Sequence, residues 1–181
     1  ARSRGIMDMS MRTPSGIPGL DELIEDGFPR GRVILLMGEP GSGKTIFANQ
    51  FLVKGIQGYG ENGVFVTLDE TKHHLQSEMA KFKWDLESLE KAGKLAFVDA
   101  TPLRLLPEKV KFGEVAIDRK DFTMASLVQA INREVERIRA KRVAVDSMTS
   151  LIFQYPDTIQ RRVALLDLIG ALSATNATCV V

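Results

Sequence analysis

Eight consecutive residues near the amino end of the chain have the types and spacing of a phosphate-binding loop. They read Gly38, Glu39, Pro40, Gly41, Ser42, Gly43, Lys44 and Thr45, which fits G-x-x-x-x-G-K-[ST] throughout. The glycines allow a tight turn that brings backbone N–H groups close to phosphate oxygens. Lys44 can place its charge against the β- and γ-phosphates, and the Thr45 hydroxyl suits Mg²⁺. The loop therefore predicts a site for ATP with Mg²⁺.

Asp146 is expected to be the second residue on the metal side of this site. A phosphate loop alone does not hydrolyse ATP, because a second carboxylate near the metal and a residue that positions water are also needed. The apolar segment 142–146 ends in Asp146, and open α/β sheets bind their ligands at the carboxyl ends of the strands. Asp146 is predicted to hold Mg²⁺ through a water molecule, and capping of the following helix is the alternative.

Asp69 and Glu70 are the candidates for activating the attacking water. They follow the apolar segment 64–68, so both belong to the same edge of the sheet. Successive residues of a strand point to opposite faces, so one can meet the γ-phosphate while the other turns away. Glu70 is the first choice and Asp69 the second, and either could instead cap the next helix. His73 and His74 follow without a third ligand at a suitable spacing, and we interpret them as surface residues.

Five short apolar runs predict the strands that position these residues. They cover residues 33–37, 64–68, 95–98, 143–145 and 178–181. Runs that are apolar at nearly every position suit strands buried on both faces, and helical patterns separate them. The sequence therefore predicts an α/β fold with a mostly parallel central sheet flanked by helices.

Apolar residues at steps of three and four predict the helices. One stripe joins Leu75, Met79, Phe82, Leu86 and Leu89 in a single helix, a second joins Leu127, Ile131, Val135 and Ile138, and a third joins Ile159, Val163, Leu166, Ile169 and Leu172. A further helix is expected over residues 44–56, and its inward-facing residues are Phe47, Phe51 and Leu52.

Two segments do not follow this rhythm. Residues 1–12 contain three Met and three Arg without periodicity. We interpret them as a tail or interface arm, which leaves residues 13–181 as one domain. Residues 101–121 contain Pro102, Pro107 and Gly113, and we interpret them as a surface excursion. The excursion either lies at a subunit contact or has no specific role.

The composition excludes several classes of protein. The 181 residues include 24 Lys and Arg against 23 Asp and Glu, which gives no reason to expect a dedicated nucleic-acid or membrane-surface protein. The apolar runs are too short to span a bilayer, and residues 1–7 lack the apolar run of a signal peptide. A cytoplasmic location is therefore expected. The one cysteine, Cys179, lies in an apolar run and is expected to be a buried small hydrophobe.

With these motifs in place, the chain resembles the RecA-superfamily ATPases of the KaiC type, including the KaiC-like proteins of archaea. The similarity covers essentially the whole chain after the tail. It includes the lead-in TPSGIPGLDEL at 13–23, GFPRG at 27–31, FVTLDE at 65–70, WDL at 84–86, GKL at 93–95 and VDSMTSL at 145–151. Two residues depart from the family pattern, because Asp26 stands where glycine is usual and Asp69 where glutamate is usual.

The resemblance implies a RecA-like fold, slow hydrolysis of ATP with Mg²⁺, and hexameric rings that hold ATP between neighbouring subunits. It also implies that the paired acidic residues, Asp69 and Glu70 here, carry hydrolysis. The shorter Asp69 side chain would alter the position of the water. The strand at 178–181 would lie between the phosphate-loop strand and the Asp146 strand.

Family members continue with further strands whose basic residues reach the γ-phosphate of a neighbour, so the natural protein is expected to be longer than this chain. The basic residues that act across the interface are then expected beyond Val181. Arg161 and Arg162 are interface candidates, although a solvated helix face explains them equally well.

Three functions remain open. The first is a slow, ring-forming ATPase that acts as a switch or regulatory assembly for an unknown protein partner. The second is a DNA-related recombinase or motor, which would predict basic loops after the Asp146 strand, whereas residues 147–155 contain no Lys or Arg. The third is a nucleotide-binding scaffold with negligible turnover. The switch is favoured, and Ser147 and Thr149 are not predicted to be phosphorylation sites.

Overall fold

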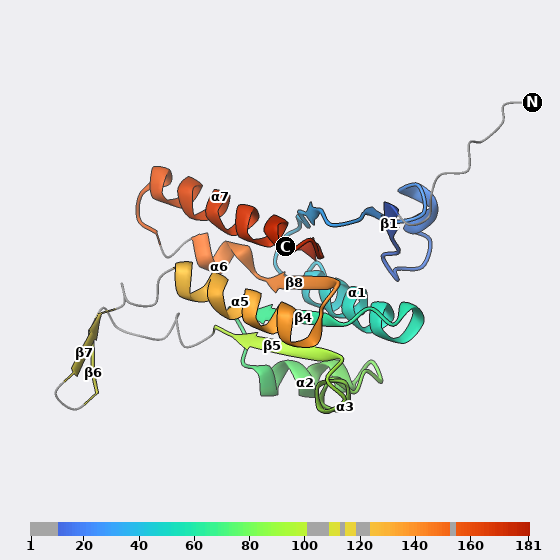
Figure 1. Ribbon diagram of the computed structural model, residues 1–181, viewed down its shortest axis with the longest axis horizontal. Helices are drawn as coiled ribbons and strands as arrows, with labels where there is room; N and C mark the ends of the chain where they lie inside the picture. The colour runs from blue at the N-terminus through green and yellow to red at the C-terminus, as the bar shows by residue number, and fades with distance from the viewer. Residues whose placement is uncertain (1–10, 101–108, 113–114, 119–123, 153–154) are drawn as a thin grey trace, which may run out of the picture.

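A five-stranded parallel sheet forms the centre of the molecule (Figure 1). The computed structural model describes residues 11–100, 109–112, 115–118, 124–152 and 155–181. The strands lie in the order β3-β9-β8-β4-β5. They are β3 (Val33–Ile34), β4 (Gly63–Thr67), β5 (Leu95–Asp99), β8 (Arg142–Asp146) and β9 (Thr178–Val180). All five coincide with predicted runs, and β9 lies between β3 and β8 as predicted. β3 is shorter than the predicted 33–37, because only Val33 and Ile34 lie opposite residues of β9.

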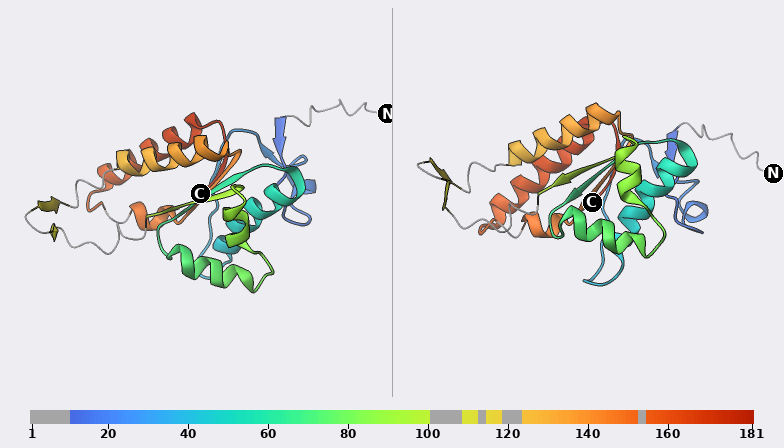
Figure 2. Two further views of the ribbon diagram at one scale, coloured as in Figure 1. Left: turned by 60° about the horizontal axis from the view of Figure 1, so that its bottom comes forward. Right: turned by 90° about the horizontal axis from the view of Figure 1, so that it is seen from below.

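Two layers of helices cover the two faces of this sheet (Figure 2). α5 (Met124–Ile138) and α7 (Thr158–Ala174) pack on one face, and α1 (Lys44–Tyr59), α2 (Lys72–Ala80) and α3 (Leu86–Lys91) pack on the other. Alternate residues of β4 belong to the two cores, since Val64 and Val66 face α5 and α7 whereas Phe65 faces α1. Burial on both faces explains why such strands read as nearly continuous apolar runs.

The apolar stripe over residues 75–89 forms two helices, and the prediction of a single helix is wrong. Between α2 and α3, Lys83 adopts a left-handed backbone with φ of 62°, a conformation that cannot continue a right-handed helix. The Asp85 carboxylate then accepts a 2.9 Å hydrogen bond from the Ser88 N–H and caps α3. Apolar residues recur on both sides of the break because α2 and α3 pack into the same core.

The other predicted helices form, but α7 turns an unexpected face to the sheet. α5 buries all four members of its stripe, and α1 buries Phe51 and Leu52 while Phe47 is half-buried. Of the predicted stripe in α7, Leu172 is buried and Ile169 is half-buried, but Ile159, Val163 and Leu166 are 72%, 52% and 59% exposed. Ala164 and Leu168, which lie outside the stripe, are buried instead. Because α7 is apolar on more than one face, its spacing alone could not identify the buried one.

Part of the predicted surface excursion has regular structure. β6 (Lys109–Phe112) and β7 (Val115–Asp118) pair as an antiparallel two-stranded sheet, and the rest of residues 101–121 lies outside the described residues. At the amino end, β1 (Arg12–Thr13) pairs with β2 (Phe28–Pro29), so Arg12 belongs to the fold and not to the predicted tail. Residues 1–10 lie outside the described part. None of the described helices is long and apolar enough to cross a bilayer.

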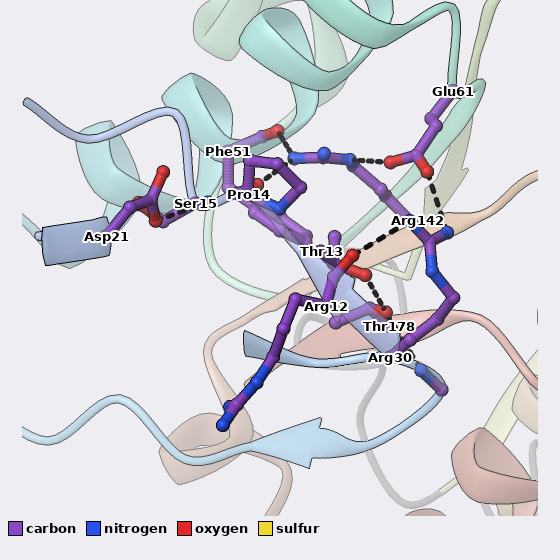
Figure 3. Close-up of polar contacts among 11 residues, drawn as sticks. Arg12, Thr13, Pro14, Ser15, Asp21, Arg30, Phe51, Glu61, Arg142 and Thr178 are labelled. Atoms are coloured by element: carbon purple, nitrogen blue, oxygen red, sulfur yellow. Dashed lines mark hydrogen bonds and ion pairs between the residues drawn. The ribbon is translucent and has the colours of Figure 1, made fainter. Parts of the chain in front are cut away.

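A buried arginine joins the amino-terminal segment to the sheet (Figure 3). Arg142, at the start of β8, is fully buried and forms an ion pair of 2.7 Å with Glu61. Its Nη1 donates to the backbone oxygens of Pro14 at 2.8 Å and Phe51 at 3.0 Å. Its guanidinium also lies 4.6 Å from the centre of the Phe51 ring. One side chain therefore connects β8, α1 and the segment that leads to the phosphate loop.

Glu61 gives this cluster a predicted pH dependence. Burial alone would raise the pKa of Glu61, but hydrogen bonds and charges from Arg30 and Arg142 outweigh burial and lower it below the ordinary 4.5. A lowered pKa stabilises the fold above the unfolded-state pKa, and this contribution is lost as pH falls through the folded-state pKa. We expect Glu61→Gln to lower the free energy of unfolding by about 1.5–3 kcal/mol at neutral pH.

The difference in free energy of unfolding between Glu61→Gln and the parent should narrow as the pH is lowered below the ordinary Glu61 pKa of 4.5. Urea unfolding at several pH values measures it. The matched control is Glu25→Gln, because Glu25 pairs with Arg12 but is 66% exposed and exposed pairs contribute little. A gap that stays constant with pH would contradict this prediction.

Candidate active site

The phosphate loop, residues 38–43, connects β3 to α1 and depends on glycine at three positions. Gly41 and Gly43 have φ of 82° and 90°, the left-handed region that other residues rarely adopt. A side chain at Gly38 would bring its Cβ within 2.4 Å of the Ser42 hydroxyl oxygen. These restraints hold the backbone of the loop close to the amino end of α1.

Lys44 places its ammonium group over this loop. Its Nζ donates to the backbone oxygens of Gly38 at 2.7 Å and Glu39 at 2.8 Å. Lys44 is also the first residue of the sixteen-residue helix α1, whose amino end carries the positive end of the helix dipole. A cation and the N–H groups of the first helical turn therefore lie together, which is the arrangement that binds phosphate.

Thr45 and Asp146 come together beside the loop from two different elements. Thr45 Oγ1 in α1 donates a hydrogen bond of 2.5 Å to Asp146 Oδ2 at the end of β8. Burial raises the pKa of the Asp146 carboxyl, and the charges of Asp69 and Glu70 raise it further, against the opposing effects of Thr45 and Lys44. The acidic residues predicted for the site therefore lie close enough to influence one another.

The donor atoms at this point fit Mg²⁺. A hydroxyl and a carboxylate are the hard oxygen ligands that the ion prefers, and Mg²⁺ commonly takes one or two protein ligands together with substrate phosphates. Within the described ranges, no group of three or more His, Cys, Asp or Glu side chains could hold a metal ion by itself. Thr45 and Asp146 are thus suited to a metal shared with a nucleotide.

The two neighbouring carboxylates have different partners. Asp69 accepts hydrogen bonds from the hydroxyls of Ser147, at 2.7 Å, and Ser150, and Ser150 belongs to the short helix α6 (Met148–Ile152). Asp69 thereby ties the end of β4 to the segment after Asp146. Glu70 Oε2 instead lies 3.0 Å from His74 Nδ1, in α2.

The cap of α2 is Thr71, and not either of the two predicted alternatives Asp69 and Glu70. Its side chain accepts a hydrogen bond of 3.3 Å from the His74 N–H. Both histidines are exposed, as predicted. The contact between His74 and Glu70 was not predicted, although their spacing of four residues at a helix start could have indicated it. Ser147 and Ser150 were likewise missed as partners of Asp69.

A cavity beside the loop is lined by Lys44 and Asp146, but not by Asp69 or Glu70. Lys44, Asp146 and Ser147 contribute polar groups to this cavity, and Leu35 and Val180 at the strand ends contribute apolar ones.

The two arginines predicted as interface candidates, Arg161 and Arg162, lie away from this cavity, at the start of α7. Arg161 donates a hydrogen bond of 2.7 Å to the backbone oxygen of Tyr155. The side chain of Arg162 is exposed.

Comparison with known proteins identifies relatives over nearly the whole chain. A family profile described as "ATPase: KaiC" matches residues 13–181. The circadian clock protein KaiC3 of Synechocystis is 39% identical over 92% of this chain and 31% of its own length. The UPF0273 protein MJ1359 of Methanocaldococcus jannaschii is 36% identical over 91% of this chain and 67% of its own length. The chain thus spans about a third of the first of these relatives and two thirds of the second.

A solved structure agrees with these matches. The KaiC-like protein PH0186 from the archaeon Pyrococcus horikoshii superposes with a TM-score of 0.77 and is 41% identical. The superposition covers 93% of this chain and 68% of the other. The likeness is therefore one of sequence as well as of fold.

Proposed function

This chain belongs to the KaiC family of ATPases, and from that premise we propose that it binds ATP with Mg²⁺ and hydrolyses it slowly. The observation that carries the proposal is the 2.5 Å contact between Thr45 and Asp146 beside the Lys44 ammonium. It joins the phosphate loop to the strand end that would hold the metal, at the edge of the sheet where Asp69 and Glu70 also lie.

Each residue of the site has a proposed role in cleaving the γ-phosphate. Lys44 and the loop N–H groups bind the β- and γ-phosphates, while Thr45 and Asp146 would hold Mg²⁺, which neutralises phosphate charge. Glu70 orients a water molecule and accepts its proton as the oxygen attacks the γ-phosphorus. The bond from that phosphorus to the bridging oxygen breaks, and ADP and phosphate leave. Asp69, held by two serine hydroxyls, is the alternative base.

The family resemblance also supports a proposal about assembly. We propose that residues 12–181 form a domain that works in the cytoplasm as a homo-oligomer, a hexameric ring with ATP between subunits, and that the residues before Arg12 act as a tail or interface arm. In this proposal hydrolysis serves as a switch for a protein partner. A DNA-related motor is not favoured, since residues 147–155 carry no Lys or Arg.

Removing the Lys44 ammonium should weaken nucleotide binding. We expect Lys44→Ala to raise the Kd for ATP by about 10- to 100-fold, because charge-assisted hydrogen bonds to the phosphates are lost. Titration of a fluorescent ATP analogue with Mg²⁺ measures the change. Lys81→Ala is the matched control, because Lys81 lies on the surface of the molecule and pairs only with the neighbouring Glu78 among the described residues. Equal affinities for Lys44→Ala and the parent would refute the proposed site.

Steady-state hydrolysis with and without DNA separates the candidate functions. The proposal expects measurable ATP turnover whose rate is unchanged by single- or double-stranded DNA at low and moderate salt. Stimulation by DNA that weakens with added salt would favour the motor, because phosphate contacts release counterions. Binding of ATP without turnover would favour the scaffold.

A further inference from the structure

We propose that His74 is a positioning residue for the Glu70 carboxylate, an inference that rests on the proposed role of Glu70 in activating water. The ring Nδ1 of His74 lies 3.0 Å from Glu70 Oε2. An ionised carboxylate can only accept hydrogen bonds. With Glu70 ionised, this contact requires the tautomer in which Nδ1 carries the proton and donates a hydrogen bond to Glu70 Oε2.

Local backbone geometry brings the two side chains together. Thr71 is the cap of α2, so Glu70 lies one residue before the cap and His74 is the third residue of the helix. At helix starts the third residue commonly reaches back towards the cap, and here His74 reaches one residue further. The Thr71 side chain holds the His74 N–H at 3.3 Å, which fixes the point from which the imidazole extends.

The main chain of Glu70 is also held in place by a hydrogen bond. The Thr67 hydroxyl, at the end of β4, donates a hydrogen bond of 2.5 Å to the Glu70 backbone oxygen. The end of the strand thus fixes the main chain of Glu70, and His74 restricts where its carboxylate points. A glutamate side chain otherwise has several rotamers, and most of them would carry the carboxylate away from a productive position.

The neighbouring carboxylate, that of Asp69, is oriented by different partners. Asp69 accepts hydrogen bonds from Ser147 and Ser150, which follow β8 in the chain. Serine hydroxyls after β8 thus orient one member of the acidic pair, and an imidazole from α2 orients the other. The second arrangement uses a histidine four residues after the glutamate.

Because the His74 and Glu70 side chains are exposed, an effect of His74 on the orientation of Glu70 can be separated from an effect on folding stability. The side chains of His74 and Glu70 are 60% and 42% exposed, and exposed pairs contribute little to folding. Loss of the imidazole should therefore change the orientation of Glu70 and leave the folded domain intact.

The test uses three variants of the full chain. We expect His74→Ala to lower kcat for ATP hydrolysis by about three- to tenfold, the typical net loss of one hydrogen bond, with KM and the melting temperature unchanged. His74→Asn should recover most of this loss, because its amide N–H can occupy the place of Nδ1. His73→Ala is the matched control, since the adjacent His73 is also exposed and lines the groove between α2 and α3.

A Glu70→Gln background separates failure of this inference from failure of the proposed function. If His74 acts through Glu70, then adding His74→Ala to Glu70→Gln should leave the residual rate unchanged. The inference is overturned if His74→Ala keeps the parent kcat, if Asn does not restore it, or if His73→Ala reduces it equally. If Glu70→Gln itself retains the parent kcat, the proposed role of Glu70 fails, and the inference fails with it.

Discussion

Replacing Glu70 with glutamine is expected to lower kcat for ATP hydrolysis by about 10²- to 10⁴-fold, the usual contribution of a positioned general base. The amide keeps the size of the side chain but cannot accept a proton at neutral pH. The affinity for ATP should change little, because the groups proposed to bind the phosphates are Lys44 and the loop N–H groups. Single-turnover hydrolysis, together with direct binding of an ATP analogue, measures the two effects separately.

Asp69→Asn is the matched comparison, because it makes the same chemical change in the adjacent residue. Since Asp69 accepts hydrogen bonds from Ser147 and Ser150, its substitution should disturb the segment after β8 and lower kcat by a smaller factor. A full loss in Asp69→Asn with near-normal turnover in Glu70→Gln would reverse the two assignments. Melting temperatures of both variants test whether either change acts through folding.

Arg142→Met is expected to lower the free energy of unfolding by about 3–5 kcal/mol, the typical effect of removing one partner of a buried ion pair. The variant retains an apolar side chain beside Phe51 but leaves Glu61 without its 2.7 Å partner. The backbone oxygens of Pro14 and Phe51 also lose their donor, and unpaired buried acceptors are costly. Urea unfolding followed by circular dichroism measures the change.

Two further substitutions check the origin of that effect. Arg142→Lys keeps a positive charge but cannot bond to Glu61, Pro14 and Phe51 in the same geometry, so an intermediate loss is expected. Arg137→Met removes an arginine of α5 that is 54% exposed and pairs with Glu134, and it should cost less than about 1 kcal/mol. Equal effects of Arg142→Met and Arg137→Met would mean that burial of the pair is unimportant.

The sequence predicted the sheet well because burial on both faces leaves a clear pattern. Each strand of the central sheet falls on an apolar run, and the resemblance to KaiC-type ATPases placed β9 correctly between β3 and β8. The break between α2 and α3 was missed, because a lysine at position 83 gives no sign in the sequence that its backbone is left-handed. The buried face of α7 was missed because a helix that is apolar on several faces has no unique stripe.

The residues of the candidate site could also be predicted only in part. The loop at 38–45 and the strand-end carboxylates could be found, because spacing and strand ends are local properties of the sequence. Their partners depend on which elements meet, as with Asp69 and Ser150, and no local pattern contains that information. A departure from the family pattern has a local explanation, since Asp26 stands where glycine is usual and has φ of 68°, a conformation that aspartate tolerates better than most residues.

The single cysteine of the chain makes the opening of the sheet measurable. Cys179 lies fully buried in β9, between β3 and β8, and burial raises the pKa of its thiol to about 12. Alkylating reagents attack the thiolate, so the native protein should resist labelling until β9 separates from its neighbours. The rate of modification then reports how often the centre of the domain opens. The labelling rate of Cys179 would thus compare how often the sheet opens in the Arg142 and Glu61 variants and in the parent, under native conditions and without denaturant.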